Sequence, residues 1–242
     1  MRVFLNMLLI IVLIFTVACS AKVSGREDAL QKVQEKNYEK TIYWMPVENQ
    51  KIQIVFDEKE SNLLIVSYLT IDKSRLNNTN ELSFLIDEDT KLQSFTINNE
   101  SRPIERILQY DENNFEKTLE YAFVEKIRFF ANIWKFTLTD EDLAQDKINL
   151  MVKYTISNQS KDEAYSKDKD GFALNGDLWW YPSTMNDGGN IQLELNIKDD
   201  FEVLYANKPL PYDKLRSYKF YKHTVQNLFD APLSLEAKKV NK

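Results

Sequence analysis

The chain contains one histidine, His223, and one cysteine, Cys19. A zinc site of the His-Glu-x-x-His type needs two histidines on one helix, which a single histidine cannot supply. The Gly-x-Ser-x-Gly elbow of serine hydrolases is absent, and among 37 acidic residues no pattern singles out a glycosidase-like carboxylate pair. We therefore expect no enzymatic activity, no catalytic residue, no metal ligand and no cofactor. We assign His223 to an ordinary surface or edge position.

The segment "SKDKDGFALNGD", residues 166–177, has a partial likeness to a calcium-binding loop. Asp168, Asp170 and Gly171 fall at the third, fifth and sixth positions of such a loop. The first position is a serine, however, the last is an aspartate, and no flanking helices are evident. The simpler interpretation is a polar Asp-Gly turn that leads into a strand, and calcium binding stays open as the alternative.

The stretch "GDLWWYPSTMNDGGN", residues 176–190, concentrates aromatic residues among glycines. Four of the five glycines of the chain lie between Gly171 and Gly189. Neighbouring side chains on a strand point to opposite faces, so Trp179 and Trp180 cannot enter the same core layer. One of them, or Tyr181 on the side of Trp179, should face outward or lie under a loop. We expect a mainly structural cluster with an interaction role for one face, made of Trp179, Trp180, Tyr181 and Pro182.

The first residues, "MRVFLNMLLIIVLIFTVACS", have the layout of a secretory signal. A basic Arg2 precedes an apolar run at 7–17, and a small Ala18 precedes Cys19. The apolar run is shorter than the roughly 20 residues of a membrane-spanning helix. Residues 16–19 match the lipobox of bacterial lipoproteins, although Thr16 stands where leucine is more usual. This pattern predicts a signal peptide at 1–18 and acylation of Cys19; the alternative is a plain secretory signal.

Charge indicates how such a protein would meet a membrane. Removal of residues 1–18 would leave 30 basic and 37 acidic residues, a net charge of −7. Attraction to anionic lipids is therefore not expected, and membrane lipid would be bound through the acylated Cys19. The scattered basic residues also argue against nucleic acid as a partner. We expect a cell-membrane or outer-membrane anchor facing the periplasm or the exterior, with a polar tether at 19–41 that has a short helical hint at Leu30 and Val33.

The rest of the chain, 42–242, has the pattern of one all-β domain. Apolar residues alternate with polar ones at 148–156 and 191–197, and further short apolar runs are split by Asp, Asn and Lys clusters. These runs are "KIQIVF", "LLIVSYLTI", "ELSFLI", "LQSFTINN", "FEVLYAN" and "LSLEAKKV". The pattern predicts an antiparallel β-sandwich or saddle-shaped sheets. The spacing of Leu119, Phe123, Ile127 and Phe130 favours one short helix, and bulged strands are the alternative.

The segment "NGDLWWYPSTMNDGGNIQLELNIKDDFEVLYAN" resembles a known arrangement. Its order of strand, loop, Trp-Tyr-Pro, strand, charged turn and strand is similar to the N-terminal β-sandwich domain of the membrane alanyl aminopeptidase superfamily of zinc peptidases. The resemblance covers about 42–240, with "INLMVKYTIS" as the strand before the loop. In that family the domain packs against a peptidase domain, whose zinc helix and Gly-x-Met-Glu-Asn strand would follow Lys242. No catalytic residue of the family can be transferred to this sequence.

Together these features lead to one expectation and one alternative. The expectation is a non-catalytic bacterial lipoprotein whose β-sandwich binds an envelope protein partner. The alternative is a detached non-catalytic subunit, or a remnant, of a zinc aminopeptidase or of a membrane-linked peptidase or transporter complex.

Overall fold

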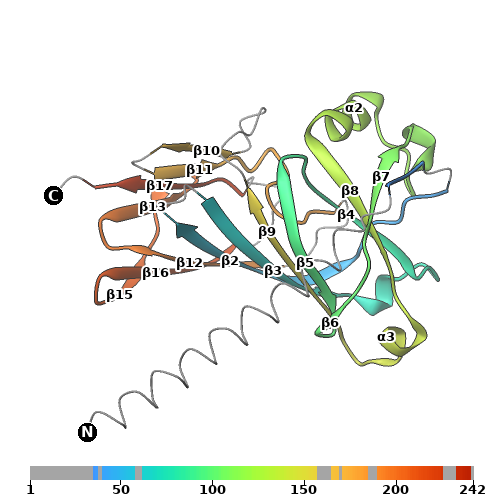
Figure 1. The fold of residues 1–242 in the computed structure, drawn as a ribbon, viewed down its shortest axis with the longest axis horizontal. Coiled ribbons are helices and arrows are strands. Elements are labelled where there is room, and N and C mark those ends of the chain that lie inside the picture. The colour runs from blue at the N-terminus through green and yellow to red at the C-terminus, as the bar shows by residue number, and fades with distance from the viewer. Residues whose placement is uncertain are drawn as a thin grey trace, which may run out of the picture.

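A computed structural model describes residues 35–37, 40–57, 62–156, 165–168, 171–184, 190–225 and 233–240. Its strands form an eight-stranded, a five-stranded and a four-stranded sheet (Figure 1). Most strand pairs are antiparallel, and the described strands include two parallel pairs, β1–β7 and β2–β12. The expected all-β sandwich is confirmed.

The eight-stranded sheet is the centre of the fold. Its strand order is β15-β16-β12-β2-β3-β9-β5-β6. The strands are β2 (Val47–Asp57), β3 (Asn62–Ile71), β5 (Thr90–Ile97), β6 (Glu100–Ser101), β9 (Ile148–Ile156), β12 (Asn190–Lys198), β15 (Tyr212–Leu215) and β16 (Tyr218–Val225).

The two smaller sheets pack on one face of the large sheet. The four-stranded sheet has the order β1-β7-β8-β4 and the five-stranded sheet the order β10-β11-β17-β13-β14. Their strands are β1 (Glu35–Asn37), β4 (Glu81–Asp87), β7 (Glu105–Gln109), β8 (Ala131–Thr137), β10 (Tyr165–Asp168), β11 (Gly171–Leu174), β13 (Phe201–Tyr205), β14 (Lys208–Pro209) and β17 (Leu235–Lys239). The five-stranded sheet packs on the β16 end of the large sheet, where Tyr221 contacts Phe201. The four-stranded sheet packs on the β5 end, where Phe84 contacts Phe95.

The described residues form two apolar cores. The main core lies between the large sheet and both smaller sheets and includes Ile65, Phe84 and Val203. The second core lies on the other face of the four-stranded sheet, where Leu85 meets Ile127 of the helix α2 (Tyr121–Phe130). Strands β4 and β8 are buried along almost their whole length because each of them faces both cores.

The strands expected from alternation are present. The apolar positions of β9 and β12 are buried and the positions between them are exposed or half-buried. The other quoted runs lie in β2, β3, β4, β5, β13 and β17. Inward positions therefore build the main core, as the period of two predicts.

Of the two alternatives at 119–130, the helix is confirmed. Val124 and Ile127 of α2 are buried against the four-stranded sheet, and Phe123 is half-buried. The helix passes directly into β8 at Ala131. The second short helix, α3 (Asp140–Ala144), begins after Thr139 with a capping box, and single 3-10 turns occupy Lys73–Arg75 (η1) and Glu112–Asn114 (η2).

Part of the expected tether at 19–41 is described. Residues Glu35–Asn37 form β1, which pairs in parallel with β7. Cys19, the signal segment and the helical hint at Leu30 and Val33 lie outside the described residues. None of the helices that the described residues form has the length and apolar character needed to span a membrane.

Candidate interaction site on the open sheet face

The aromatic cluster lies in a turn, not in a strand, and its residues enter different cores. Trp180 is completely buried in the main core, where its Nε1 donates a 2.8 Å hydrogen bond to the carbonyl of Leu233. Tyr181 packs against Trp180 edge to face, with ring centroids 5.0 Å apart. Because the turn breaks the alternation of a strand, Tyr181 shares the side of Trp180; the expected placement beside Trp179 is wrong.

Trp179 packs into the second core. It is half-buried and meets Phe123 of α2 edge to face at 5.9 Å. The ammonium of Lys126 lies 5.5 Å from the centre of the indole ring and donates to the carbonyl of Asp177 at 3.0 Å. The two tryptophans thus occupy separate layers, as expected, but the turn rather than strand alternation separates them.

Backbone contacts fix the rest of the cluster. Ser183 exchanges two hydrogen bonds with Leu85 of β4, at 2.8 and 2.9 Å. The buried Gln50 of β2 donates from Nε2 to the carbonyl of Pro182 at 3.1 Å. The segment therefore links the large sheet to the four-stranded sheet and leaves little surface for a partner.

The calcium-like segment forms a β-hairpin across β10 and β11. Asp168 pairs with Gly171, and Ser166 pairs with Ala173. This extended pairing favours the turn interpretation, because a calcium loop must wrap its ligands around one point. Packing also explains the glycine at position 171, because a Cβ there would lie 1.9 Å from the carbonyl oxygen of Ala237. Asp170 lies outside the described residues.

His223 lies in β16 opposite Leu193 of β12. Its half-buried ring has its centre 4.8 Å from that of Tyr205. Within the described part of the chain, no three His, Cys, Asp or Glu side chains are grouped closely enough to hold a metal ion.

A different feature is the face of the eight-stranded sheet that points away from the smaller sheets, which we call the open face. The register aligns Gln192 of β12 with Lys51 of β2, and Lys51 with Tyr68 of β3. Tyr68 is in turn opposite Met151 of β9. These side chains are exposed or half-buried, and they alternate with the buried apolar residues of the same strands.

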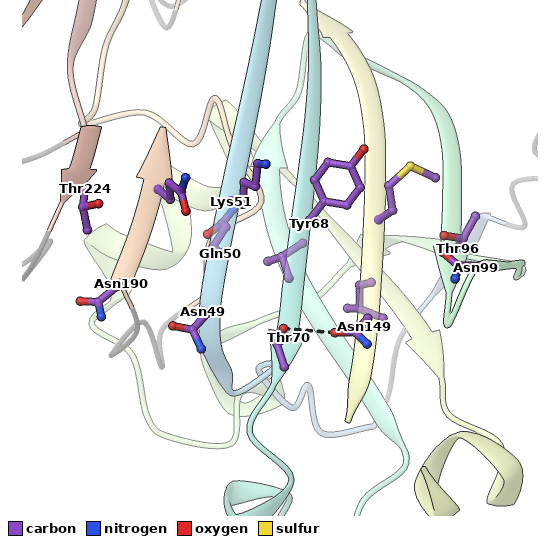
Figure 2. A pocket seen from close by; sticks show the side chains of 14 residues that line it. Asn49, Gln50, Lys51, Tyr68, Thr70, Thr96, Asn99, Asn149, Asn190 and Thr224 are labelled. Carbon is purple, nitrogen blue, oxygen red and sulfur yellow. Dashed lines mark hydrogen bonds between the residues drawn. The ribbon is translucent and has the colours of Figure 1, made fainter. Parts of the chain in front are cut away.

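The open face is hollowed over its central strands. The hollow has a volume of about 620 Å³ and a lining dominated by amide and hydroxyl side chains, with Tyr68 in the middle (Figure 2). Thr70 donates to Asn149 Oδ1 at 3.2 Å across β3 and β9. The other polar lining residues on this face include Asn49, Asn99, Asn190, Gln192 and Thr224.

The charged side chain of the hollow has a partner. Lys51 lies 2.8 Å from Glu194 Oε2, and Gln53 and Gln192 donate to the same carboxylate at 2.9 and 3.0 Å. Partial burial acts to raise the pKa of Glu194, but the hydrogen bonds from Gln53 and Lys51 and the charge of Lys51 outweigh it and lower that pKa. Glu194 therefore compensates part of the Lys51 charge, and it also interacts with the charge of Lys222 on β16.

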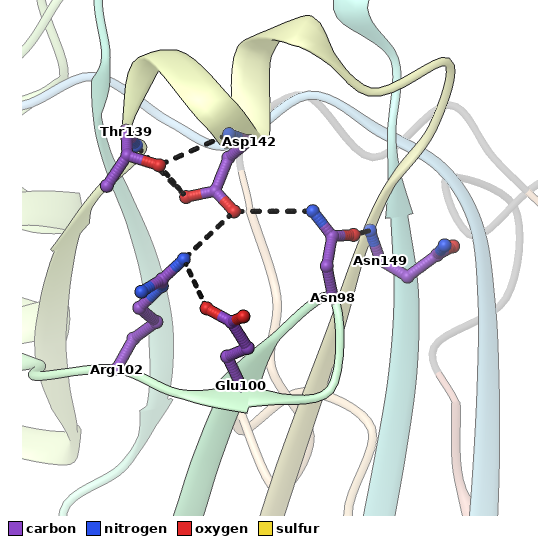
Figure 3. Close-up of polar contacts among 6 residues, drawn as sticks. All are labelled: Asn98, Glu100, Arg102, Thr139, Asp142 and Asn149. Atoms are coloured by element: carbon purple, nitrogen blue, oxygen red, sulfur yellow. Dashed lines mark hydrogen bonds and ion pairs between the residues drawn. The ribbon is translucent and has the colours of Figure 1, made fainter.

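A buried carboxylate supports one end of the hollow (Figure 3). Asp142 of α3 is only 2% exposed and accepts hydrogen bonds from the backbone N–H of Thr139 at 3.0 Å and from its hydroxyl at 2.9 Å. It also accepts from Asn98 at 3.3 Å and from Arg102 at 3.4 Å. Burial acts to raise the pKa of Asp142, yet the Thr139 hydrogen bonds and the Arg102 charge hold it below its ordinary value.

This network positions the β5–β6 turn. Asn98 and Asn99 both have positive φ, 49° and 68°, which suits a tight two-residue hairpin turn. The Asn98 side chain accepts a 3.0 Å hydrogen bond from the backbone N–H of Asn149 (Figure 3). Asp142 is thereby connected through Asn98 to Asn99 and Asn149, two lining residues of the hollow.

A second, smaller hollow of about 450 Å³ lies toward the β15 edge of the open face. Here Val55 is 49% exposed and Phe220 is 38% exposed, on β2 and β16. Asn196 of β12 pairs with both residues and lies between them. The open face thus changes from polar near Tyr68 to more apolar near β15.

The sequence analysis did not identify the open face as a site. Its residues come from strands that are distant in the sequence, such as β2 and β12, and form no local motif. One signal in the sequence could have pointed to the open face. The outward positions of the alternating strands include amides such as Asn190 and Gln192, where a solvated face more usually carries charged residues.

Comparisons with known proteins support the fold. No family model and no curated protein matches the chain. An M1 zinc metallopeptidase from Deinococcus radiodurans is similar in structure, with 10% identity, a TM-score of 0.50, and coverage of 81% of this chain and 42% of that chain. Yeast LTA4 hydrolase in complex with bestatin matches at 8% identity and a TM-score of 0.46, over 81% of this chain and 29% of its own.

This chain therefore spans less than half the length of these solved structures. At such identity the likeness to the Deinococcus metallopeptidase is one of fold. It is consistent with the resemblance of the sequence to the N-terminal β-sandwich domain of that superfamily.

Proposed function

We propose that this protein is a non-catalytic binding module, anchored to an envelope membrane through acylated Cys19, which binds its ligand on the open face. The observation that carries the proposal is the hollow of about 620 Å³, most of whose described lining residues carry uncharged hydrogen-bonding side chains. A volume of this size falls within the roughly 300–1,000 Å³ of small-molecule sites.

The hollow is built on a rigid support. Every second residue of its strands is buried in the main core, as Leu69 and Leu150 are beside Tyr68 and Asn149. Binding groups held on packed strands lose little conformational freedom when a ligand arrives, which favours affinity.

The side-chain chemistry favours binding over catalysis. General acid–base catalysis uses titratable groups within hydrogen-bond reach of the reacting atoms. In the part of the lining that the structure describes, the titratable side chains are those of Lys51 and Tyr68, and Lys51 is already paired with Glu194. The amides and hydroxyls around them are suited to recognition.

The membrane anchor has a direct test. Cells would be grown with an alkyne fatty acid, and the protein would be compared with its Cys19→Ala variant. We expect the native protein to carry the label in the membrane fraction and the variant to lose both label and sedimentation with membranes. Equal labelling of the two proteins would contradict acylation at Cys19.

The binding surface is tested by photo-crosslinking in cells. A benzophenone amino acid would replace Tyr68 on the open face or, as the matched exposed position, Tyr121 on α2. We expect adducts from position 68 to exceed those from position 121. Absence of any adduct from position 68 would contradict binding at the open face.

A second candidate function is a separately encoded, non-catalytic subunit of a zinc aminopeptidase. It is favoured by the fold likeness to the Deinococcus metallopeptidase and by two exposed aromatic residues on α2, Tyr121 at 65% and Phe129 at 61%. This function predicts adducts from position 121 rather than 68, and zinc-dependent aminopeptidase activity that co-purifies with the native protein.

A further inference from the structure

We propose that the hollow of the open face binds a neutral carbohydrate chain. This inference rests on the proposed function and names the ligand class of the same site. It is carried by three properties of the lining: its hydrogen-bonding groups, its exposed tyrosine and its charge.

The first property is the match between amides and sugar hydroxyls. An Asn or Gln side chain presents a donor and an acceptor together, and a sugar hydroxyl likewise donates and accepts. Such pairs reach the hollow from Asn49 of β2, from Asn149 of β9 and from Asn190 and Gln192 of β12, with Thr224 at its β16 side. A ligand rich in hydroxyls can satisfy these groups in many places along its length.

The second property is the aromatic surface at the centre of the hollow. Tyr68 is 43% exposed in the middle of β3, between Lys51 of β2 and Met151 of β9. A partly exposed ring next to amides offers an apolar surface for the C–H groups of a sugar ring. Tyrosine suits this role because it buries a large area and keeps a polar hydroxyl.

The third property is charge. Lys51 is the charged residue among the described lining residues, and its ammonium pairs with Glu194 at 2.8 Å. Among the described residues, the lining contains no carboxylate that would attract a cationic peptide or a metal ion. A neutral ligand therefore fits better than an anionic or a cationic one, even though the whole chain carries a net charge of −6.

The dimensions suit an oligosaccharide that crosses the strands. From Thr224 through Gln192, Lys51 and Tyr68 to Met151, the register passes over five neighbouring strands. At about 4.8 Å for each step between strands, this row is about 19 Å long. That length accommodates several linked sugar units.

The test is calorimetric titration of the native protein with neutral hexasaccharides, namely cello-, malto-, chito- and xylohexaose, and with anionic oligogalacturonate. We expect at least one neutral hexasaccharide to bind, with an affinity that added salt changes less than threefold. Tyr68→Ala should weaken this binding at least tenfold, Tyr68→Phe should retain it within about threefold, and Tyr121→Ala should leave it unchanged. Thermal unfolding of each variant would verify that it is folded.

Three results would overturn the inference. They are no binding of any neutral hexasaccharide at millimolar concentration, binding that Tyr68→Ala leaves unchanged, and salt-sensitive binding of oligogalacturonate alone. If no saccharide binds but position 68 crosslinks to a protein in cells, the carbohydrate inference fails and the proposed binding module stands. If position 68 gives no adduct as well, both fail.

Discussion

The same strands make the inner face and the open face of the eight-stranded sheet. Along each strand, alternate residues point to one face and then to the other. In β12 the inward residues Ile191 and Leu193 are buried in the main core, and Gln192 between them lines the hollow. The inner face has partners in two smaller sheets, and its apolar side chains follow from the need to exclude water. On the open face the fold requires only solubility, so its concentration of amides and an exposed tyrosine calls for a functional explanation.

The largest effect is expected where the inner face is locked to its partners. Trp180→Ala would remove a fully buried indole and leave the carbonyl of Leu233 without its donor. We expect a loss of about 3–5 kcal/mol in the free energy of unfolding, from the cavity and the lost contacts. Urea unfolding would measure it.

Two further variants make that measurement specific. Trp180→Phe keeps an aromatic ring and loses the Nε1 donor, so its cost should be smaller than that of alanine. Trp179→Ala affects a half-buried ring in the second core and should also cost less. A larger effect at Trp179 than at Trp180 would show that the second core, not the main core, dominates stability.

The sharpest comparison of the two faces uses neighbouring residues of β3. Leu69 points into the main core and is 2% exposed, and Tyr68 points from the open face. Leu69→Ala should lower the free energy of unfolding by about 2–5 kcal/mol. Tyr68→Ala should change it by about 0.5 kcal/mol or less, as is usual for exposed positions. Equal losses in urea unfolding would mean that Tyr68 is a packing residue.

These two faces also explain what could be predicted from the sequence. Alternation in β9 and β12 identified the inward residues because burial imposes a period of two on them. It identified the outward residues only as the polar half of the same pattern. The parallel pairing of β2 with β12 brings Asn49 beside Asn190, and no local motif encodes a contact between such distant segments.

The aromatic cluster shows a second reason why the structure differs from what the sequence predicts. Adjacent Trp179 and Trp180 were expected to separate because strand neighbours alternate. They occupy a turn, which ends with Ser183 bonded to Leu85. Tertiary contacts determine the local conformation of this segment. A run of apolar residues is compatible both with a strand and with a turn that connects two cores, so the sequence does not distinguish them.

A third prediction concerns Asp142, whose hydrogen bonds support one end of the hollow. Asp142→Asn would remove the charge that Asn98, Arg102 and Thr139 surround. At pH 7 we expect a loss of about 1–3 kcal/mol in the free energy of unfolding, since hydrogen bonds to a buried charge are strong. Urea unfolding would measure it.

The pH dependence of this loss has a defined sign. The folded-state pKa of Asp142 is lowered, so its contribution is fully present above the unfolded-state value of about 3.9 and is lost as the pH falls through the folded-state value. The difference between native protein and variant should therefore shrink on acidification toward pH 3. The exposed Asp140 of the same helix provides the control, Asp140→Asn. A difference that grows on acidification would mean that burial dominates the pKa of Asp142.

The smallest effect on stability, and the most specific one on binding, is expected for Glu194→Gln. Glu194 and Lys51 form a partly exposed ion pair, and such pairs contribute about 1 kcal/mol or less to the free energy of unfolding. The variant would, however, leave the Lys51 ammonium without its compensating charge beside the hollow. Titration should then show salt-sensitive binding of oligogalacturonate that the native protein lacks. Glu236→Gln breaks a comparable pair with Lys238 on β17, away from the hollow, and should not change binding. If Glu194→Gln gains no anion affinity, neutralisation of Lys51 does not set the charge preference of the open face, and the preference for neutral ligands loses its electrostatic basis.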